Sequence, residues 1–346
     1  MIKSYQLSEL PRRLSAFSPL KASFEFSAED FTVDEIPAYL PCGEGEHLFV
    51  LVKKQNRNTQ DVIRQLERQL EIPSADIGHA GLKDRNATTT QWLSLRGVRA
   101  EQLQTVDIDG VTFLECQLHQ NKLRTSHLKG NRFGIRLKDA EGDCASRAEE
   151  MLQILSEKGI PNFFGPQRFG KEGRNHIDGK LFMQGKKKVR AKWLKRFLLS
   201  SYQSALFNDL LAHRMEAELL DTVLQGDILK KHGSGGIFVC ESPEEDQVRL
   251  DQFELSPTAC MPGHKVQLAQ GESGAWEQDL LEREELAPDA FQRFKKMAMG
   301  TRRSLRAPLS EPEVLEQEDG LWLRFSLPSG AYASIVLFEL GLLSFE

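Results

Sequence analysis

The apolar pattern of this chain changes from strand-like to helical and then back to strand-like. In the first part, short strand candidates lie at residues 47–52, 92–95, 111–118 and 133–137. The middle is mainly helical from about residue 159 to about residue 306, and strand candidates return at residues 321–327 and 332–337. The fold must therefore place strands from both ends of the chain around one helical segment.

An insertion explains this order, because the late strands resemble the first region more than the middle. A helix predicted at residues 145–157 ends at Gly159 and marks the first boundary. We therefore predict that residues 1–158 and 307–346 form one α+β domain, from which residues 159–306 emerge as an inserted domain.

The composition narrows the class of protein. A length of 346 residues suits two domains, and 40% hydrophobic with 27% charged residues excludes disordered, collagen-like and coiled-coil chains. No apolar run approaches the roughly 20 residues that span a bilayer, and the start lacks the apolar core of a secretory signal. The five cysteines are far apart and odd in number, which favours a reducing compartment and argues against a zinc site. We predict a cytoplasmic protein without a membrane partner.

Basic residues are unevenly distributed, although the net charge is −5. Residues 151–200 hold twelve basic and three acidic side chains, and residues 116–138 hold six basic and no acidic ones. An acidic protein can therefore still have a basic cleft for a nucleic acid. The densest run, Lys186–Arg196, has two interpretations of equal weight: it binds phosphates, or it is the solvated face of a helix.

Several common sites are missing from the sequence. It contains no phosphate-binding glycine loop of the P-loop or dinucleotide type, no G-x-S-x-G motif, and no H-x-H or H-E-x-x-H pair. We therefore expect neither a nucleotide cofactor nor a metal.

One candidate for chemistry is Asp84, which lies between Lys83 and Arg85 in a glycine-containing segment before a strand. Neighbouring cations hold a carboxylate ionised, and an ionised, partly desolvated Asp can act as a nucleophile or base. The competing interpretation, an Asx-turn with both cations in solvent, describes the commoner situation.

A second candidate is the basic segment around Asn131 and Phe133. An Asn amide can pair with the edge of a base, and a Phe ring can stack on its face. The alternative is a hairpin turn at Gly130–Asn131 with Phe133 in the core, which these residue types favour about two to one.

Six segments, in the same order along the chain, resemble the TruD family of tRNA pseudouridine synthases. They are Glu29–Glu35, Gly81–Gln91, Leu128–Phe133, Gly159–Gly170, Ser204–Asn208 and Leu327–Tyr332. The resemblance implies an α+β pseudouridine-synthase catalytic domain with a mixed, mainly antiparallel sheet, and an inserted α/β domain of the type named TRUD.

The resemblance also implies roles for single residues. Asp84 matches the catalytic aspartate, and four positions match contacts to the target uridine: Phe31, Asn131, Phe133 and Tyr332. The basic residue usual six positions before the N-terminal phenylalanine is replaced by Glu25. Lys83, Arg85 and Lys21 are therefore the candidate electrostatic partners of Asp84.

The function implied is isomerisation of a uridine, at position 13 of tRNA, to pseudouridine by a chain that acts as a monomer without a cofactor. The uridine must be flipped out of its stack to reach a carboxylate. The alternative from another class is a non-catalytic RNA-binding chaperone that uses the same basic cleft. A carboxylate glycosidase is disfavoured because the Asp84 motif has no second carboxylate.

Overall fold

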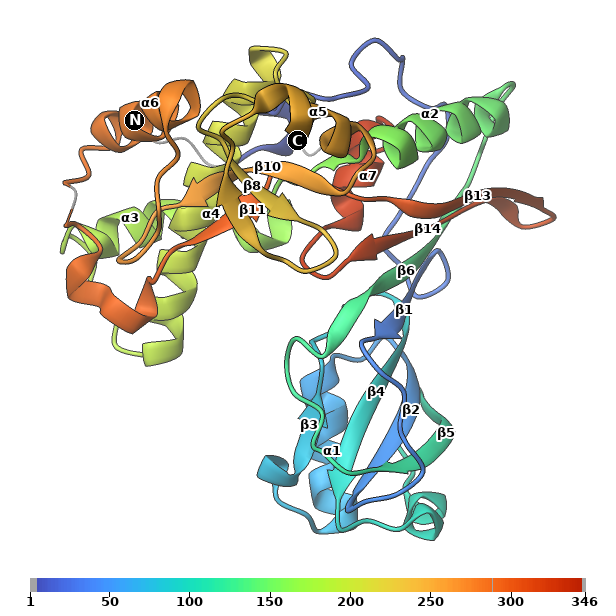
Figure 1. Ribbon diagram of the computed structural model, residues 1–346. Coiled ribbons are helices and arrows are strands. Elements are labelled where there is room, and N and C mark those ends of the chain that lie inside the picture. The colour runs from blue at the N-terminus through green and yellow to red at the C-terminus, as the bar shows by residue number, and fades with distance from the viewer. Residues whose placement is uncertain (1–4, 288, 344–346) are drawn as a thin grey trace. The chain divides into compact units, whose positions relative to one another are not determined.

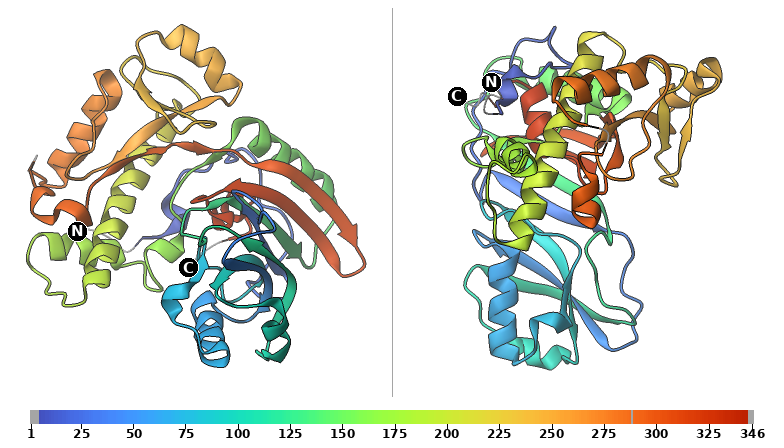
Figure 2. Two further views of the ribbon diagram at one scale, coloured as in Figure 1. Left: turned by 60° about the horizontal axis from the view of Figure 1, so that its bottom comes forward. Right: turned by 90° about the vertical axis from the view of Figure 1, so that its left-hand side faces the viewer.

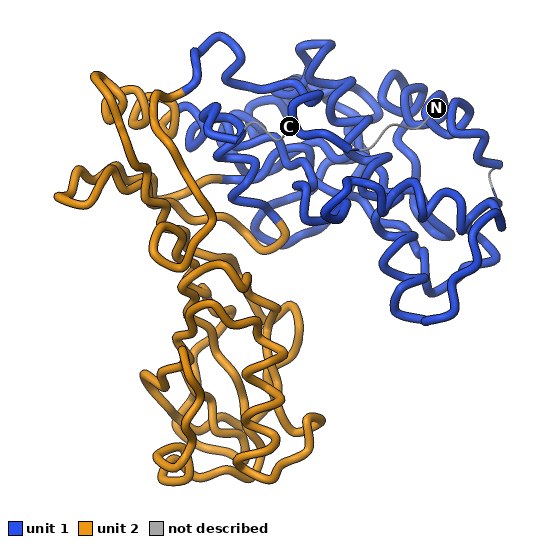
Figure 3. Tube along the Cα trace, turned by 180° about the vertical axis from the view of Figure 1, so that it is seen from behind, with its two compact units in different colours: residues 1–19, 154–308, 331–346 blue, residues 20–153, 309–330 orange. Residues whose placement is uncertain are grey.

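The computed structural model describes residues 5–287 and 289–343. The chain forms two compact units (Figure 3). Unit 1 comprises Met1–Pro19, Ile154–Pro308 and Ala331–Glu346, and unit 2 comprises Leu20–Gln153 and Leu309–Gly330. The domain boundaries at residues 158 and 307 remain a prediction. Among the described residues, no helix combines the length and the apolar character needed to cross a membrane.

Unit 2 is built on an eight-stranded sheet in the order β13-β14-β6-β1-β4-β2-β5, with β3 paired to β4 (Figure 1). Its strands are β1 (Phe31–Pro37), β2 (His47–Gln55), β3 (Ile77–His79), β4 (Thr88–Arg96), β5 (Val111–His119), β6 (Leu128–Leu137), β13 (Ser310–Gln317) and β14 (Gly320–Pro328). The β1–β4 pair is parallel, and the other described pairs are antiparallel. The predicted α+β class with a mainly antiparallel sheet is therefore confirmed, and the late strand β14 joins the sheet of the first region.

The register of the central strands places the motif residues side by side. On β1 and β6, Val33 is opposite Phe133 and Glu35 is opposite Asn131. The other neighbour of β6 is β14, which approaches so closely that a Cβ on Gly130 would lie 2.2 Å from the carbonyl oxygen of Leu327. Only glycine fits at this position without moving the backbone.

Helix α1 (Thr59–Leu70) covers the lower part of this sheet (Figures 1 and 2). Asn58 caps it, since its side-chain oxygen accepts a hydrogen bond from the Asp61 amide at 2.8 Å. The apolar face predicted from helical spacing packs against buried residues of β2 and β4; it consists of Val62, Ile63, Leu66 and Leu70. The first residue of the helix, Thr59, also accepts a hydrogen bond from the Lys83 amide in the loop that carries Asp84.

Unit 1 combines helices with a four-stranded sheet in the order β11-β10-β8-β9. Its strands are β8 (Ile228–Lys231), β9 (Ile237–Val239), β10 (Leu255–Met261) and β11 (Thr301–Ser304), with a short separate pair β7 (Ile160–Pro161) and β12 (Arg306–Ala307). Its helices are α3 (Asn175–Met183), α4 (Lys192–Glu216), α5 (Pro243–Asp251), α6 (Gly271–Arg283) and α7 (Ala333–Glu339), and α2 (Cys144–Lys158) spans the boundary of the units. The long helix α4 contributes much of the apolar core of this unit (Figure 2).

Two expectations from the sequence were wrong. Residues 332–337 are not a strand, because Ala333–Glu339 form helix α7, whose side chains from Ile335 to Glu339 are all buried. A continuous apolar run does not distinguish a strand from a buried helix. The hairpin turn at Gly130–Asn131 is also absent, since both residues lie inside β6.

Candidate active site

The loop that carries Asp84 joins β3 to β4 and is hydrogen-bonded to the start of helix α1. The Lys83 amide donates to the Thr59 hydroxyl at 3.0 Å, and that hydroxyl donates to the Gln91 side-chain oxygen at 2.8 Å. The exposure of the side chains increases along the loop, since Lys83 is buried, Asp84 is half-buried and Arg85 is exposed. The competing interpretation placed both cations in solvent, and the burial of Lys83 contradicts that part of it. The Asx-turn itself stays a prediction.

Lys54, on β2, holds the main chain of this loop. Its ammonium donates to the carbonyl oxygens of Asp84 at 2.8 Å and Arg57 at 2.6 Å, and lies 3.5 Å from that of Lys83. Burial lowers the pKa of Lys54 to about 8, while the charge of Asp84 acts to raise it. A buried cation therefore sits against the segment that presents the candidate catalytic carboxylate.

Lys54 was not among the residues predicted to partner Asp84. The signal that would have found it is the alternation along β2, where Lys54 shares a buried face with Val50 and Val52. A lysine that continues a buried alternating series must have polar partners.

Lys83 links the Asp84 loop to the neighbouring strands. Its ammonium lies 3.1 Å from Glu35 Oε2 on β1 and donates to Asn131 Oδ1 on β6 at 2.8 Å. Glu35 also accepts from the Trp92 amide at 3.2 Å. Burial raises the pKa of Glu35, and the Lys83 charge opposes this rise. The Asn131 carbonyl is thus oriented toward Lys83.

The other two cations proposed for Asp84 lie at the surface. Arg85 and Lys21 are both exposed, and neither forms an ion pair with another residue of the described chain. All three assignments to Asp84 stay predictions.

The two phenylalanines of the predicted uridine pocket stack on each other. The rings of Phe31 and Phe133 have centroids 6.0 Å apart at an interplanar angle of 15°, and Phe325 lies 5.7 Å from Phe133. Phe31 is 2% exposed and Phe133 is 5% exposed, so a base could meet only small edges of these rings. Their contact with the uridine stays a prediction.

Replacing Phe133 by Ala should lower the free energy of unfolding by roughly 3 kcal/mol, because it leaves a cavity between two packed rings. Urea unfolding would measure this loss, and turnover on tRNA would be measured per folded molecule. Phe325→Ala is the matched control, since it opens a cavity beside the same aromatic rings while Phe133, the proposed uridine contact, is kept. If Phe133 serves the core alone, both variants will keep wild-type turnover in the folded fraction.

The basic stretch at residues 116–138 has acidic neighbours from elsewhere in the sequence. Arg136 and Lys138 contact the buried Asp30 at 2.5 and 2.6 Å, and Arg136 also contacts Asp319 at 2.9 Å. Arg132 pairs with Glu311 at 2.5 Å. Burial raises the pKa of Asp30, but the hydrogen bonds from Lys138 and Arg136 outweigh it and hold that pKa below its usual value. Three of the six basic residues in this stretch are therefore largely neutralised.

Tyr332 lies in unit 1, where it precedes helix α7. Its ring is half-buried and packs on Phe164 with centroids 6.0 Å apart. Its contact with the uridine stays a prediction.

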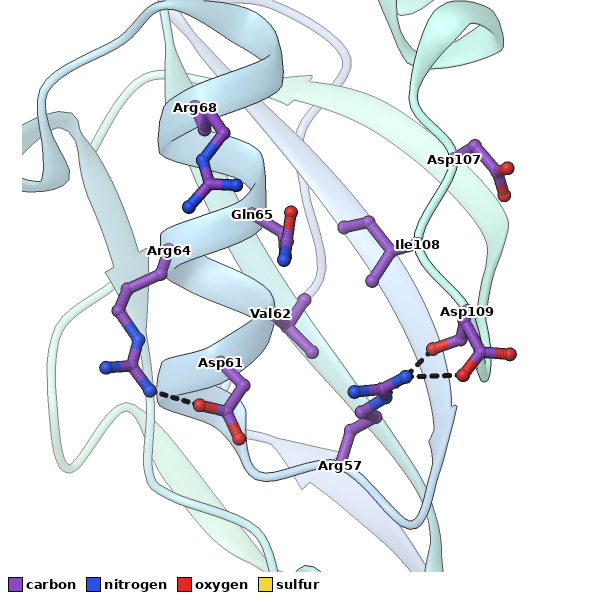
Figure 4. Close-up of a pocket in the computed structure, with 9 residues that line it drawn as sticks. All are labelled: Arg57, Asp61, Val62, Arg64, Gln65, Arg68, Asp107, Ile108 and Asp109. Atoms are coloured by element: carbon purple, nitrogen blue, oxygen red, sulfur yellow. Dashed lines mark hydrogen bonds and ion pairs between the residues drawn. The ribbon is translucent and has the colours of Figure 1, made fainter.

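A pocket of about 530 Å³ lies beside α1 (Figure 4). Its rim holds three arginines and three aspartates, and the drawn contacts pair Arg57 with Asp109 and Arg64 with Asp61. The charges balance, so the pocket does not favour an anion. Among the described residues, no three His, Cys, Asp or Glu side chains gather as metal ligands.

The pKa of Lys54 predicts how stability depends on pH. Between about pH 8 and the ordinary lysine value of 10.5, the folded protein has lost a proton that the unfolded chain keeps. The unfolded state then binds more protons, so this residue makes stability rise with pH across that window. Urea unfolding at pH 7.5 and 9.5 should show a smaller rise for Lys54→Met than for wild type. Lys53→Met, at an exposed neighbour, should keep the wild-type rise, and equal slopes in all three proteins would contradict the prediction.

The chain is similar in sequence and in fold to known proteins. The family model described as tRNA pseudouridine synthase D (TruD) matches residues 15–192 and 187–340. A tRNA pseudouridine synthase D from Anaeromyxobacter dehalogenans is 45% identical over 318 residues, covering 90% of both chains, and one from Thermus thermophilus is 46% identical over 313 residues, covering 90% of this chain and 86% of that one. A solved structure from Methanosarcina mazei, described as a candidate enzyme of the same name, has a TM-score of 0.77 and 23% identity, covers 97% of each chain, and confirms the predicted fold. The matched segments contain every residue of the site built above, and the chain belongs to the tRNA pseudouridine synthase D (TruD) family.

Proposed function

We propose that this protein isomerises a uridine of tRNA, at position 13, to pseudouridine, and that Asp84 is its catalytic residue. Membership of the TruD family and the names of its relatives support the reaction. The observation that carries the site is the Asp84 loop, whose main chain is held by Lys54 and which is joined through Lys83 to Asn131. The proposal places all of these groups around one flipped nucleotide.

The reaction breaks the N1–C1′ bond, rotates the uracil and forms a C5–C1′ bond, while a hydrogen leaves C5 and one is gained at N1. It is redox-neutral and needs no group donor. Asp84 acts as an anion that attacks C6 or C1′, or removes a proton from C2′. The uridine must leave its stack first, because these atoms are out of reach inside a helix.

The neighbouring residues divide into contacts and positioning groups. Asn131, Phe31, Phe133 and Tyr332 contact the uridine. Lys54 is a positioning residue, because it acts on the main chain of Asp84. Lys83 orients the Asn131 amide, so that its NH₂ group is free to donate to an oxygen of the base.

Product analysis tests this function. Purified protein would be incubated with bulk tRNA that lacks the modification, and the nucleosides would be identified by mass spectrometry. Pseudouridine supports the proposal. Unchanged tRNA would mean a non-catalytic RNA-binding chaperone, for which the comparisons give no support, and released uracil would mean a glycosidase.

Binding of tRNA should weaken steeply with salt despite the net charge of −5, because basic side chains displace counterions from phosphates. The affinity would be measured by filter binding between 50 and 200 mM salt, where about six contacts correspond to a loss of roughly 1,000-fold. An affinity that does not change with salt would instead indicate a small-molecule substrate.

The cellular setting is also part of the proposal. The five cysteines are free, two of them exposed, which suits the cytoplasm. We further propose that the protein works as a monomer, which sedimentation of the free enzyme and of its tRNA complex would check.

A further inference from the structure

A pocket of about 1150 Å³ opens at the start of helix α4 in unit 1. It brings together the first turns of α4, the 3-10 segment Gln292–Met297 and the loop that follows this segment. The residues on which the inference depends are Arg168, Lys192, Trp193, Arg196, Phe197 and Lys296. This pocket contains none of the uridine contacts proposed above.

The pocket has a one-sided charge. Four of its side chains are basic, and none of its described lining residues is acidic. Lys192, Arg196 and Lys296 are exposed, and within the described part of the chain none of them forms an ion pair. This arrangement differs from the pocket beside α1, where arginines and aspartates pair. Unpaired cations around a hollow fit a polyanion.

Arg168 is the positioned cation of this group. It donates to the hydroxyl of Ser204 at 3.1 Å and to that of Ser200, and its guanidinium lies over the rings of Phe164 and Phe197. Burial lowers its pKa, and the described residues supply no carboxylate to pair with it. A half-buried guanidinium held by two hydroxyls is prepared for an anionic ligand.

The pocket also offers an aromatic surface. Trp193 is 70% exposed, although it lies one residue inside a helix, and Phe197 is one turn further along the same helix. Aromatic rings interleaved with cations are the combination that binds unstacked nucleotides, since the rings meet bases and the cations meet phosphates. A surface that recognises protein would be expected to be less basic.

The pocket is close to Tyr332 within the same unit. The Arg168 guanidinium lies 5.6 Å from the centre of the Phe164 ring, and the next ring along is Tyr332, 6.0 Å from Phe164. If Tyr332 contacts the target uridine, as proposed, a neighbouring nucleotide of the same strand is within reach of this pocket.

We propose that this pocket is a second RNA subsite, which holds an unstacked nucleotide of the tRNA strand next to the target uridine. Its base stacks on Trp193, and the flanking phosphates contact Arg168, Lys192, Arg196 and Lys296. The inference rests on the proposed function, because it takes tRNA as the ligand. It assigns Lys192 and Arg196, at the C-terminal end of the dense basic run, to phosphate binding.

Three variants and one control test the subsite. Trp193→Ala removes the stacking surface, Trp193→Phe keeps a smaller ring, and Arg196→Gln removes one charge. Lys188→Gln is the matched control, since Lys188 is an exposed lysine of the same basic run that does not line the pocket. Binding of tRNA lacking the modification would be measured across a range of salt concentrations, with melting curves to verify folding.

We expect Trp193→Ala to weaken tRNA binding by about 5-fold or more, the low end for one stacked base, and Trp193→Phe to weaken it less. Arg196→Gln should reduce the salt slope by about 0.7–0.9, the value for one phosphate, while Lys188→Gln leaves it unchanged. Trp193 is also a direct reporter, because tRNA should quench a fluorescence component that disappears in Trp193→Phe.

Wild-type tRNA affinity in both Trp193→Ala and Arg196→Gln would overturn the subsite. A salt slope reduced as much by Lys188→Gln as by Arg196→Gln would also overturn it, because the effect would then come from the general positive charge of the surface and not from the pocket. If the wild-type protein is a dimer and Trp193→Ala is a monomer, the pocket binds a second copy of the chain and the RNA subsite is overturned. Failure of the proposed function is distinguishable, because the wild-type protein would then form no pseudouridine. Pseudouridine formation with unchanged binding in the variants would remove only the subsite.

Discussion

Asp84→Asn should reduce pseudouridine formation by at least about 1,000-fold, a loss in the range seen when a nucleophile or general base is removed. The amide keeps the size of the side chain but carries no negative charge to attack the uridine or accept its proton. Because the loop is held by main-chain contacts to Lys54 and Thr59, the fold and the tRNA affinity should stay close to wild type.

The measurement is single-turnover release of tritium from tRNA labelled at C5 of uridine, since that hydrogen leaves in the reaction. Asp34→Asn is the matched control, because Asp34 is an exposed carboxylate on β1, three residues from Phe31. Turnover by Asp84→Asn within 10-fold of wild type would remove Asp84 from the catalytic role, whatever the family resemblance.

Lys83→Met should destabilise the protein by about 3–5 kcal/mol at pH 7.5, because it leaves the Glu35 carboxylate buried without its cation. The side chains of this pair are only 4% and 1% exposed, so water cannot replace the lost partner. Urea unfolding would measure the loss. The double variant Lys83→Met/Glu35→Gln should recover much of it, since no charge is then left in the core.

The dependence on pH identifies the cause of this loss. Burial already raises the pKa of Glu35, and removing Lys83 takes away the opposing effect. The folded variant then holds a proton that the unfolded chain releases, so its stability falls as pH rises through the raised pKa. The deficit of Lys83→Met relative to wild type should therefore shrink at pH 5.5. A deficit that does not change with pH would point to lost packing by the lysine stem instead.

Features that depend on residues close together in the sequence could be predicted from the sequence alone. Helix α1 follows from the Asn58 cap and the helical spacing of Val62, Ile63 and Leu66. Strands β2, β5 and β6 contain the predicted apolar segments, and the return of strand character before the C-terminus correctly predicted β14 in the same sheet. The ordered motifs identified the family, which the family model and the relatives then showed.

Only the tertiary structure decided which charges meet and which side chains are buried. Lys54 contacts Asp84 across 30 residues, Lys83 contacts Asn131 across 48, and Arg132 contacts Glu311 across 179. Counts over a local window treated residues 116–138 as unopposed, because the carboxylates that pair with Arg132, Arg136 and Lys138 lie far from them in the sequence, at Asp30, Glu311 and Asp319. The run 332–337 was mistaken for a strand for a related reason: helix α7 buries Ile335–Glu339, so the sequence shows a continuous apolar run that does not distinguish a strand from a helix. Local patterns report the conformation of a segment, whereas the charge and burial of a side chain depend on which distant strands the fold places beside it.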